Sequence, residues 1–304
     1  MPGFPYWRHS NPVIARVGVP SRLGLGLALA LILVLAALLC IALAVTALHS
    51  ARVEAGGDQR LAALYPKDER RELSGADYER YPGAGVLFCR ADGIPRKAAA
   101  AWLIGNQRLV VLNAHNFRSR HLERTREVAD CFFQIGGRNY DFAPETLRLG
   151  TAPGAMSLHI TDDWALLDLA EAAENVRPQP IPASPDLPTG TATIPVVMVS
   201  PGGHANYAGQ TSLERCAIRQ IDPPSEDAIR RVRHDCNNGF GGSGSGLFDE
   251  SGRLVALHSA SLSMNSRRIF DLEYHYGSAM MFEGALLDAI RTRVAAEPAK
   301  PPVR

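Results

Sequence analysis

The stretch Gly239-Phe240-Gly241-Gly242-Ser243-Gly244-Ser245-Gly246 decides how this sequence is interpreted, because five of its eight residues are glycine. Its first six residues fit the dinucleotide-binding pattern G-x-G-x-x-G, which requires a helix directly after the glycines. Here the following residues, "LFDESGRLVALHSA", instead predict a β-hairpin that turns at Asp249, Ser251 and Gly252. The stretch is therefore not expected to bind a nucleotide.

Four other interpretations of the stretch remain, and three of them fit poorly. The phosphate loop G-x-x-x-x-G-K-[ST] lacks its lysine, and the hydrolase elbow G-x-S-x-G fails at its last position, which is Ser245. A flexible linker would not ordinarily lie between Cys236 and an apolar strand. A nucleophile turn around Ser243 is left, in which glycines permit a tight backbone and N–H groups point at a developing oxyanion.

A nucleophilic serine needs a base within hydrogen-bond reach, and the base needs a third group to orient it. The segment Arg108–Phe117, "RLVVLNAHNF", places His115 just after an apolar strand. The segment Asp162–Leu169, "DDWALLDL", places Asp163 directly before an apolar run, with Asp162 as the alternative carboxylate. Both candidate partners thus precede the serine and lie at strand ends.

In this order, the three motifs resemble those of the chymotrypsin-fold, trypsin-like serine peptidases, over about residues 83–292. The resemblance implies that His115 is the base, Asp163 the orienting carboxylate and Ser243 the nucleophile, with the backbone N–H groups of Gly241 and Ser243 as the oxyanion hole. It implies a serine endopeptidase that acts on protein or peptide substrates and needs no cofactor or metal. The alternative from another class is a catalytically silent binding or scaffold module; an esterase is a third.

Departures from the trypsin pattern bear on activation and on specificity. Gly242 stands where trypsin-like zymogens carry the aspartate that receives a new amino terminus, and Asn237 stands where trypsins carry the acid that attracts Lys or Arg. The sequence around the serine is similar instead to the bacterial glutamyl endopeptidase branch, which leaves a preference for acidic side chains open. The residues that this resemblance implies for substrate binding are Asn238, His258, Ser259 and Ser261.

Short apolar runs separated by turn residues fill the chain from Gly83 to Phe282 and predict an all-β barrel or sandwich. The resemblance narrows this to two six-stranded antiparallel Greek-key barrels. One amphipathic helix is expected at 284–296, "GALLDAIRTRVAA". A formal net charge of +1 without a Lys/Arg cluster argues against nucleic acid as the main partner.

The run Leu23–Leu48 contains 26 residues without a charge, enough for a transmembrane helix in a bilayer core about 30 Å thick. Arginines at positions 8, 16 and 22 favour a cytoplasmic N-terminal side. We expect a signal-anchor in the cytoplasmic membrane, with the catalytic domain on the periplasmic or extracellular side. The alternative is a cleaved signal, which would remove residues 1–47 and release a secreted domain.

These expectations divide the chain into five parts, which are a head (1–22), a transmembrane helix (23–48), a stalk (49–76), the peptidase domain (77–296) and a flexible tail (297–304). Four cysteines lie beyond the membrane segment, and an even number in an exported domain indicates two disulfides. Of three possible connectivities, Cys89–Cys131 with Cys216–Cys236 closes the shorter loops and is the one we expect.

Overall fold

The computed structural model describes residues 64–182, 186–203, 211–238 and 242–296 of the chain. These residues lie in one compact unit, Gly57–Arg304. The predicted head, membrane helix and tail lie outside the described residues. Among the residues that are described, no helix is long and apolar enough to cross a bilayer.

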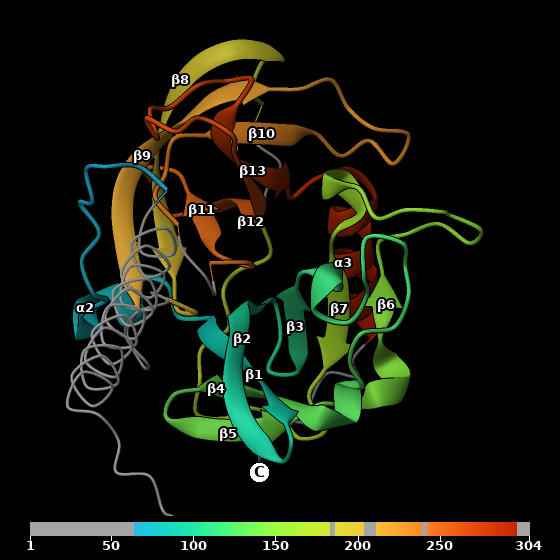
Figure 1. Ribbon diagram of the computed structural model, residues 1–304. Helices are drawn as coiled ribbons and strands as arrows, with labels where there is room; N and C mark the ends of the chain where they lie inside the picture. Colours follow the sequence, from blue (N-terminus) through green and yellow to red (C-terminus); the bar gives the residue numbers. More distant parts are fainter. Residues whose placement is uncertain (1–63, 183–185, 204–210, 239–241, 297–304) are drawn as a thin grey trace, which may run out of the picture. The chain divides into compact units, whose positions relative to one another are not determined.

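The N-terminal half forms a seven-stranded antiparallel sheet in the order β5-β4-β1-β2-β3-β7-β6 (Figure 1). A bridge between Phe142 and Leu169 joins the ends of β5 and β7, so the sheet curls into a barrel-like form. Its strands are β1 (Ala84–Ala91), β2 (Ile94–Leu103), β3 (Leu109–Leu112), β4 (Cys131–Ile135), β5 (Arg138–Asp141), β6 (Arg148–Leu149) and β7 (Ala165–Asp168).

The C-terminal half is a closed six-stranded barrel in the order β10-β13-β12-β11-β8-β9. Its strands are β8 (Gly190–Ser200), β9 (Ser212–Ile221), β10 (Arg231–His234), β11 (Gly246–Phe248), β12 (Leu254–Ser263) and β13 (His275–Met281). β11 and β12 form the predicted hairpin, in which Gly252 adopts a positive φ of 81° and its N–H donates to the carbonyl of Asp249.

The prediction of an all-β fold with two barrel-like sheets and a C-terminal helix is thus confirmed, with one correction to the strand count. The N-terminal sheet has seven strands rather than six, because β6 pairs with the edge of β7. β6 contains only two residues, so it leaves no run of apolar residues that a sequence pattern could detect.

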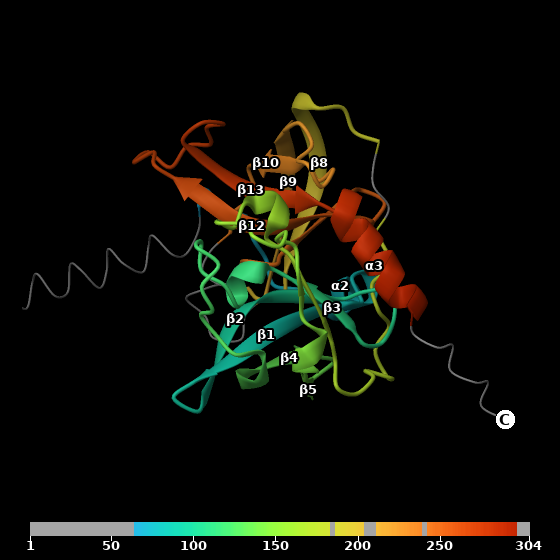
Figure 2. The same ribbon diagram turned by 90° about the vertical axis from the view of Figure 1, so that its right-hand side faces the viewer.

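Helix α3 (Gly284–Ala296) has the bounds that the sequence predicts and buries Leu286, Leu287, Ala289 and Ile290. It follows β13 of the C-terminal barrel and reaches the N-terminal sheet, as Figures 1 and 2 show. There Arg293 pairs with Asp168 of β7 at 2.7 Å. The helix therefore links the two sheets between which the functional residues lie.

Aromatic side chains fill the shared core between the two sheets. Trp102 of β2 is fully buried, and its ring meets that of Phe248 of β11 at a centroid distance of 5.1 Å. The ring of Tyr81 also packs on that of Phe248, at a centroid distance of 4.5 Å. Aromatic pairs at such distances stabilise a core by more than the burial of their apolar area alone. The pair of Trp102 and Phe248 therefore stabilises the core next to the turn that carries Ser243.

The segment 64–76, which the sequence assigned to the stalk, lies against the C-terminal barrel. Leu64 and Tyr65 are buried, and Arg71 pairs with Leu213 of β9 through two backbone hydrogen bonds. A short helix, α2 (Gly75–Arg80), follows, with Ser74 and Asp77 forming a capping box at its start. The folded unit therefore begins before the predicted boundary at residue 77.

Both expected disulfides are present. Cys89 of β1 is bonded to Cys131 of β4, and Cys216 of β9 is bonded to Cys236 just after β10. The first joins two neighbouring strands of the N-terminal sheet. The second anchors the segment that leads to Ser243.

Candidate active site

The pairing of β3 with β7 brings His115 and Asp163 together. The strands are antiparallel, with Leu112 opposite Ala165. The residues that follow β3 therefore lie beside those that precede β7. Beyond Leu112 the chain makes one 3₁₀ turn at Ala114–Asn116, which turns the His115 side chain toward Asp163.

Asp163 contacts His115 at two points. One carboxylate oxygen, Oδ1, accepts a hydrogen bond from the His115 backbone N–H at 2.8 Å, and the other, Oδ2, lies 2.7 Å from the ring Nδ1. Asn113 holds the backbone of Asp163, because its Nδ2 donates to the Asp163 carbonyl at 3.0 Å. Asp163 is only 3 % exposed, whereas the side chain of His115 is 34 % exposed. The ring is thus held by a buried carboxylate while part of the ring remains accessible.

The carboxylate of Asp162, the alternative partner of His115, contacts Thr161 instead. Its Oδ1 lies 3.2 Å from the hydroxyl of Thr161, and burial raises the pKa of its carboxyl group above the ordinary value. Of the two neighbouring aspartates, Asp163 is the one that contacts His115.

Ser243 lies in a tight turn that is fixed from both sheets. Its carbonyl accepts a hydrogen bond from the N–H of Ala100 in β2 at 2.8 Å, and the N–H of Gly244 donates to the carbonyl of His258 in β12 at 2.9 Å. The indole N–H of Trp102 donates to the carbonyl of Gly244 at 2.8 Å. Gly244 has a φ of +78°, and a Cβ there would come within 2.0 Å of the Ala100 carbonyl oxygen, so only glycine fits.

The turn directs the Ser243 hydroxyl at His115. Ser243 Oγ lies 2.9 Å from His115 Nε2, on the opposite edge of the ring from Asp163. The second serine of the turn, Ser245, is fully buried; its hydroxyl donates instead to the carbonyl of Gly242 at 2.5 Å and lies 2.7 Å from Ser200 Oγ, from which it can accept. Gly241, predicted for the oxyanion hole, lies outside the described residues.

Ser259 does not lie where the sequence predicted. It was expected to bind substrate, but its hydroxyl donates a hydrogen bond to Oδ2 of Asp163. The physical reason is a β-bulge in β12: His258 pairs with Ala279 and Ala260 pairs with Ser278, so Ser259 is an extra residue without a partner in β13. The bulge interrupts the alternation of side chains, so His258 and Ser261, three residues apart, both reach Asn238 while Ser259 reaches Asp163. Ser259 therefore belongs to the group that surrounds Asp163.

The other three predicted substrate-binding residues come together. The side-chain amide of Asn238 lies 2.6 Å from His258 Nε2 and 2.7 Å from Ser261 Oγ. His258 is 3 % exposed and Ser261 is exposed. The three form a small polar cluster on the stretches before and after the Ser243 turn.

His234 lies behind this cluster and was not expected there from the sequence. It is fully buried, and its Nε2 lies 3.0 Å from His258 Nδ1. The backbone N–H of Cys236 donates to His234 Nδ1, which must therefore be an acceptor. His234 then donates from Nε2 to His258 Nδ1, and His258 carries its own proton on Nε2. The oxygen of the Asn238 amide, rather than its NH₂ group, then faces this N–H to accept it.

Burial keeps both imidazoles of this pair neutral. It lowers the pKa of His234 to about 3 and that of His258 well below its ordinary value, with the neighbouring histidines lowering the latter further. A signal for His234 did exist in the sequence, since Arg231-Val232-Arg233-His234 alternates arginines with less polar residues, and the structure buries Val232 and His234. Its partner, 24 residues away, could not be identified from that alternation.

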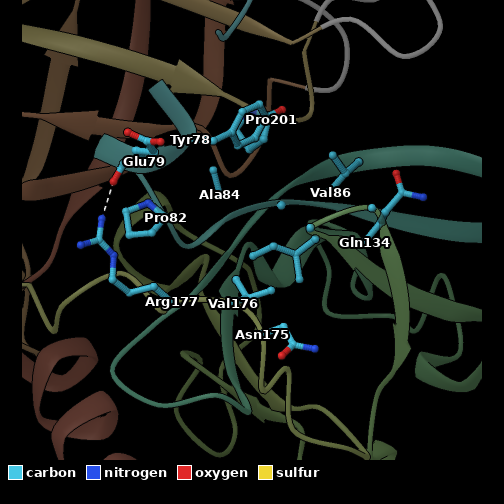
Figure 3. Close-up of a pocket in the computed structure, with 14 residues that line it drawn as sticks. Tyr78, Glu79, Pro82, Ala84, Val86, Gln134, Asn175, Val176, Arg177 and Pro201 are labelled. Atoms are coloured by element: carbon cyan, nitrogen blue, oxygen red, sulfur yellow. Dashed lines mark hydrogen bonds between the residues drawn. The ribbon is translucent and has the colours of Figure 1, made fainter. Parts of the chain in front are cut away.

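A surface pocket of about 880 Å³ lies apart from these residues (Figure 3). Its lining is largely apolar and includes Tyr78, Pro82, Val86, Val176 and Pro201. None of the residues that surround Ser243 lines it. Within the described ranges, no group of three or more His, Cys, Asp or Glu side chains is arranged to hold a metal ion.

Comparison with known proteins agrees with this geometry. The family model of the trypsin-like peptidase domain matches residues 99–257, more than half of the chain. A search of curated protein sequences finds no match.

Solved structures with the same fold include a Glu endopeptidase in complex with MPD, with 14% sequence identity and a TM-score of 0.50, covering 76% of this chain and 99% of that one. Another is a double mutant of human heparin binding protein, with 15% identity and a TM-score of 0.51, covering 78% of this chain and 100% of that one. At such identities, these likenesses concern the fold.

Proposed function

Since the chain belongs to the family of trypsin-like peptidase domains, we propose that it is a serine endopeptidase in which Ser243, His115 and Asp163 perform the reaction. The proposal rests above all on one observation, the line of contacts from Asp163 Oδ2 through both ring nitrogens of His115 to Ser243 Oγ, at 2.7 and 2.9 Å. Such a line is what nucleophilic catalysis by serine requires.

In the proposed reaction, Ser243 Oγ attacks the carbonyl carbon of a peptide bond while its proton moves to His115 Nε2. Asp163 stabilises the imidazolium that forms, because its buried carboxylate accepts the Nδ1–H. The tetrahedral intermediate collapses with transfer of the proton from Nε2 to the leaving amine, and an acyl-Ser243 remains. A water molecule then attacks the acyl carbon while its proton moves to His115 Nε2. The proton passes from Nε2 to Ser243 Oγ as the acid product leaves, which restores Ser243. The backbone N–H groups of Ser243 and Gly241 are proposed to bind the oxyanion.

Hydrolysis of a protein substrate by the full chain tests this proposal. We expect wild-type protein to cleave unfolded casein and Ser243→Ala to be inactive. The matched control is Ser245→Ala, which removes the hydroxyl of the other serine in the turn and should leave cleavage measurable. Cleavage of casein by Ser243→Ala at the wild-type rate would contradict the proposal.

We further propose a preference for an acidic side chain before the scissile bond. The Cys236 contact directs the His258 N–H toward Asn238 and Ser261. The N–H, NH₂ and O–H donors of these three side chains suit a carboxylate. Four peptides that differ only in Glu, Gln, Lys or Phe at this position test the preference. We expect Glu to be cleaved fastest, whereas equal rates for Glu and Gln would show that the charge is not recognised.

We also propose that residues 23–48 anchor the protein in the cytoplasmic membrane with the peptidase domain outside. The support is the uncharged run of 26 residues together with two disulfides in the domain, which persist in oxidising compartments. Alkaline extraction of membranes is the test. We expect full-length protein in the pellet, and its release into the supernatant would contradict the anchor.

The alternative is a catalytically silent module that binds a partner through a peptidase fold. One protein with this fold is named for heparin binding. The casein experiment separates the two, because a silent module would leave the substrate intact in every variant.

A further inference from the structure

Asn237 occupies a position from which a substrate-binding side chain could have been expected, six residues before Ser243, yet its side chain is turned inward and 3 % exposed. Its Oδ1 accepts a hydrogen bond from the N–H of Tyr65 at 2.7 Å. Its Nδ2 donates to the carbonyl of Lys67 at 2.8 Å and to Oε1 of Glu214 at 3.0 Å. Both protons of the amide and its oxygen are thus engaged within the protein, and none remains for a substrate.

Glu214 is the second member of this arrangement. It lies on β9 and is 7 % exposed, and its Oε2 accepts a further hydrogen bond, from the backbone N–H of Asn237 at 2.6 Å. Both carboxylate oxygens therefore face Asn237. Burial raises the pKa of Glu214 to about 6, which is the expected consequence of placing a carboxyl group in the interior. A buried carboxylate is costly unless it is hydrogen-bonded, so this contact stabilises Glu214 as well as Asn237.

The segment 64–67 supplies the other two contacts, and it is itself fixed. The ring of Tyr65 lies 5.4 Å from that of His275, and His275 Nε2 lies 2.8 Å from the carbonyl of Leu64. The hydroxyl of Tyr65 reaches the carbonyl of His234 at 3.3 Å. The segment therefore forms a rigid partner for Asn237 rather than a loose tether.

What Asn237 holds is the stretch that leads to the reactive serine. Cys236, directly before it, is bonded to Cys216, and Asn238, directly after it, contacts His258 and Ser261. A displacement of Asn237 would be transmitted along the chain to Asn238 and onward to Ser243. Misplacement of a reacting group by about 1 Å can cost about 100-fold in rate.

We propose that Asn237 is a positioning residue that, together with Glu214, ties the segment 64–67 to the stretch carrying Asn238 and Ser243. Backbone groups within the chain make this tie, so it does not need a newly cut amino terminus of the kind that trypsin-like zymogens use. Gly242, which stands at the position of the aspartate that receives such a terminus, has no carboxylate and is consistent with this. The catalytic consequence rests on the proposed function, whereas the tie itself does not.

An exchange of the two side chains in the full-length protein tests the proposal. Asn237→Asp places a carboxylate against that of Glu214, and we expect labelling of Ser243 by a fluorophosphonate to slow about 100-fold. Glu214→Gln alone loses one acceptor and should slow labelling about tenfold. In the double variant, the new amide at position 214 donates to the new carboxylate at position 237, so the two groups have changed places at unchanged net charge. Glu214→Gln should therefore speed labelling in the Asn237→Asp background, although it slows labelling in the wild type.

Hydrogen–deuterium exchange of the peptide covering residues 231–246 gives a readout that does not depend on catalysis. We expect faster exchange in Asn237→Asp and partial recovery in the double variant. Glu226→Gln and Asn175→Asp, at exposed positions, are the matched controls and should change neither readout.

The outcomes separate the two proposals. If Glu214→Gln has the same effect in both backgrounds, by labelling and by exchange, the two side chains do not act as a pair and the inference is overturned. A change in melting temperature alone, with labelling and exchange unaltered, also overturns it. If the wild type is never labelled but exchange shows the reversal, the proposed function fails and the tie stands.

Discussion

The carboxylate of Asp163 binds His115 through the backbone N–H and the ring at once, at 2.8 and 2.7 Å. The two contacts leave the imidazole one orientation, with Nδ1 toward Asp163 and Nε2 toward Ser243. Because a carboxylate only accepts hydrogen bonds, Nδ1 carries the proton, and Nε2 is free to receive one. The two contacts thus fix both the orientation and the tautomer that a general base needs.

Replacement of Asp163 by asparagine should reverse that tautomer. With the amide oxygen on the His115 backbone N–H, the NH₂ group would face Nδ1 and force the ring proton onto Nε2. We expect Asp163→Asn to lower kcat about 10⁴-fold, as in other enzymes with this arrangement. The measurement is steady-state hydrolysis of a peptide ester. Asp162→Asn is the matched control and should stay close to wild type; the opposite pattern would assign the role to Asp162.

Ser259→Ala should lower kcat and leave KM unchanged. The Ser259 hydroxyl donates to the buried Asp163 carboxylate, and the loss of a hydrogen bond to a charged group typically costs about 1.5–3 kcal/mol. The expected decrease in kcat is therefore about 10- to 100-fold. Ser261→Ala, by contrast, should raise KM for a peptide with an acidic side chain. An increase in KM with unchanged kcat for Ser259→Ala would restore the original assignment of Ser259 to substrate binding.

Gly244→Ala should destabilise the fold more than an ordinary glycine replacement. Its φ is +78°, and the added methyl group would overlap the carbonyl of Ala100. The strain of a positive φ costs an alanine about 1–2 kcal/mol, and the overlap should add about 1–3 kcal/mol. Urea unfolding measures the sum. Gly154 has a φ of +85° with open space around it, so Gly154→Ala should show the first cost alone; equal losses for the two variants would disprove the overlap.

Stability should fall as the solution is acidified, in part because of His234. Its pKa is about 3 in the folded protein but about 6.5 when unfolded. Below pH 6.5 the unfolded chain therefore binds a proton that the folded protein does not, and the stability present above that pH is lost progressively toward pH 3. By pH 5 this loss amounts to about 2 kcal/mol.

His234→Gln removes that titration and provides the comparison. The difference in unfolding free energy between wild type and His234→Gln should shrink by this amount from about pH 7.5 to about pH 5. His121→Gln, at an exposed position, should follow the wild type throughout. A difference that stays constant with pH would mean that His234 titrates alike in both states.

The parts of the fold and site that the sequence predicts are those marked by local patterns. His115 follows an apolar strand, Asp163 precedes one, and Gly244 marks the turn around Ser243 with a positive φ that favours glycine. Helix α3 has the predicted bounds because its apolar spacing and flanking residues lie within one short segment. Each of these signals is local, extending over a single strand, turn or helix.

The parts that the sequence did not predict depend on contacts between distant segments. The polar composition of residues 64–76 suggested a stalk, yet Tyr65 and Lys67 use backbone groups to bind Asn237, about 170 residues further along the chain. Glu214 and Asn237 lie on different segments whose approach only the barrel determines. Ser259 is the extra residue of a β-bulge in β12, an irregularity that regular strand alternation does not predict.

Identification of the residue modified by a fluorophosphonate tests the central claim most directly. The full-length protein is incubated with the reagent, digested and analysed by mass spectrometry. We expect one adduct per molecule, on Ser243, which is lost in Ser243→Ala and retained in Ser245→Ala. Absence of any adduct on correctly folded wild-type protein, or an adduct that persists in Ser243→Ala, would contradict the account.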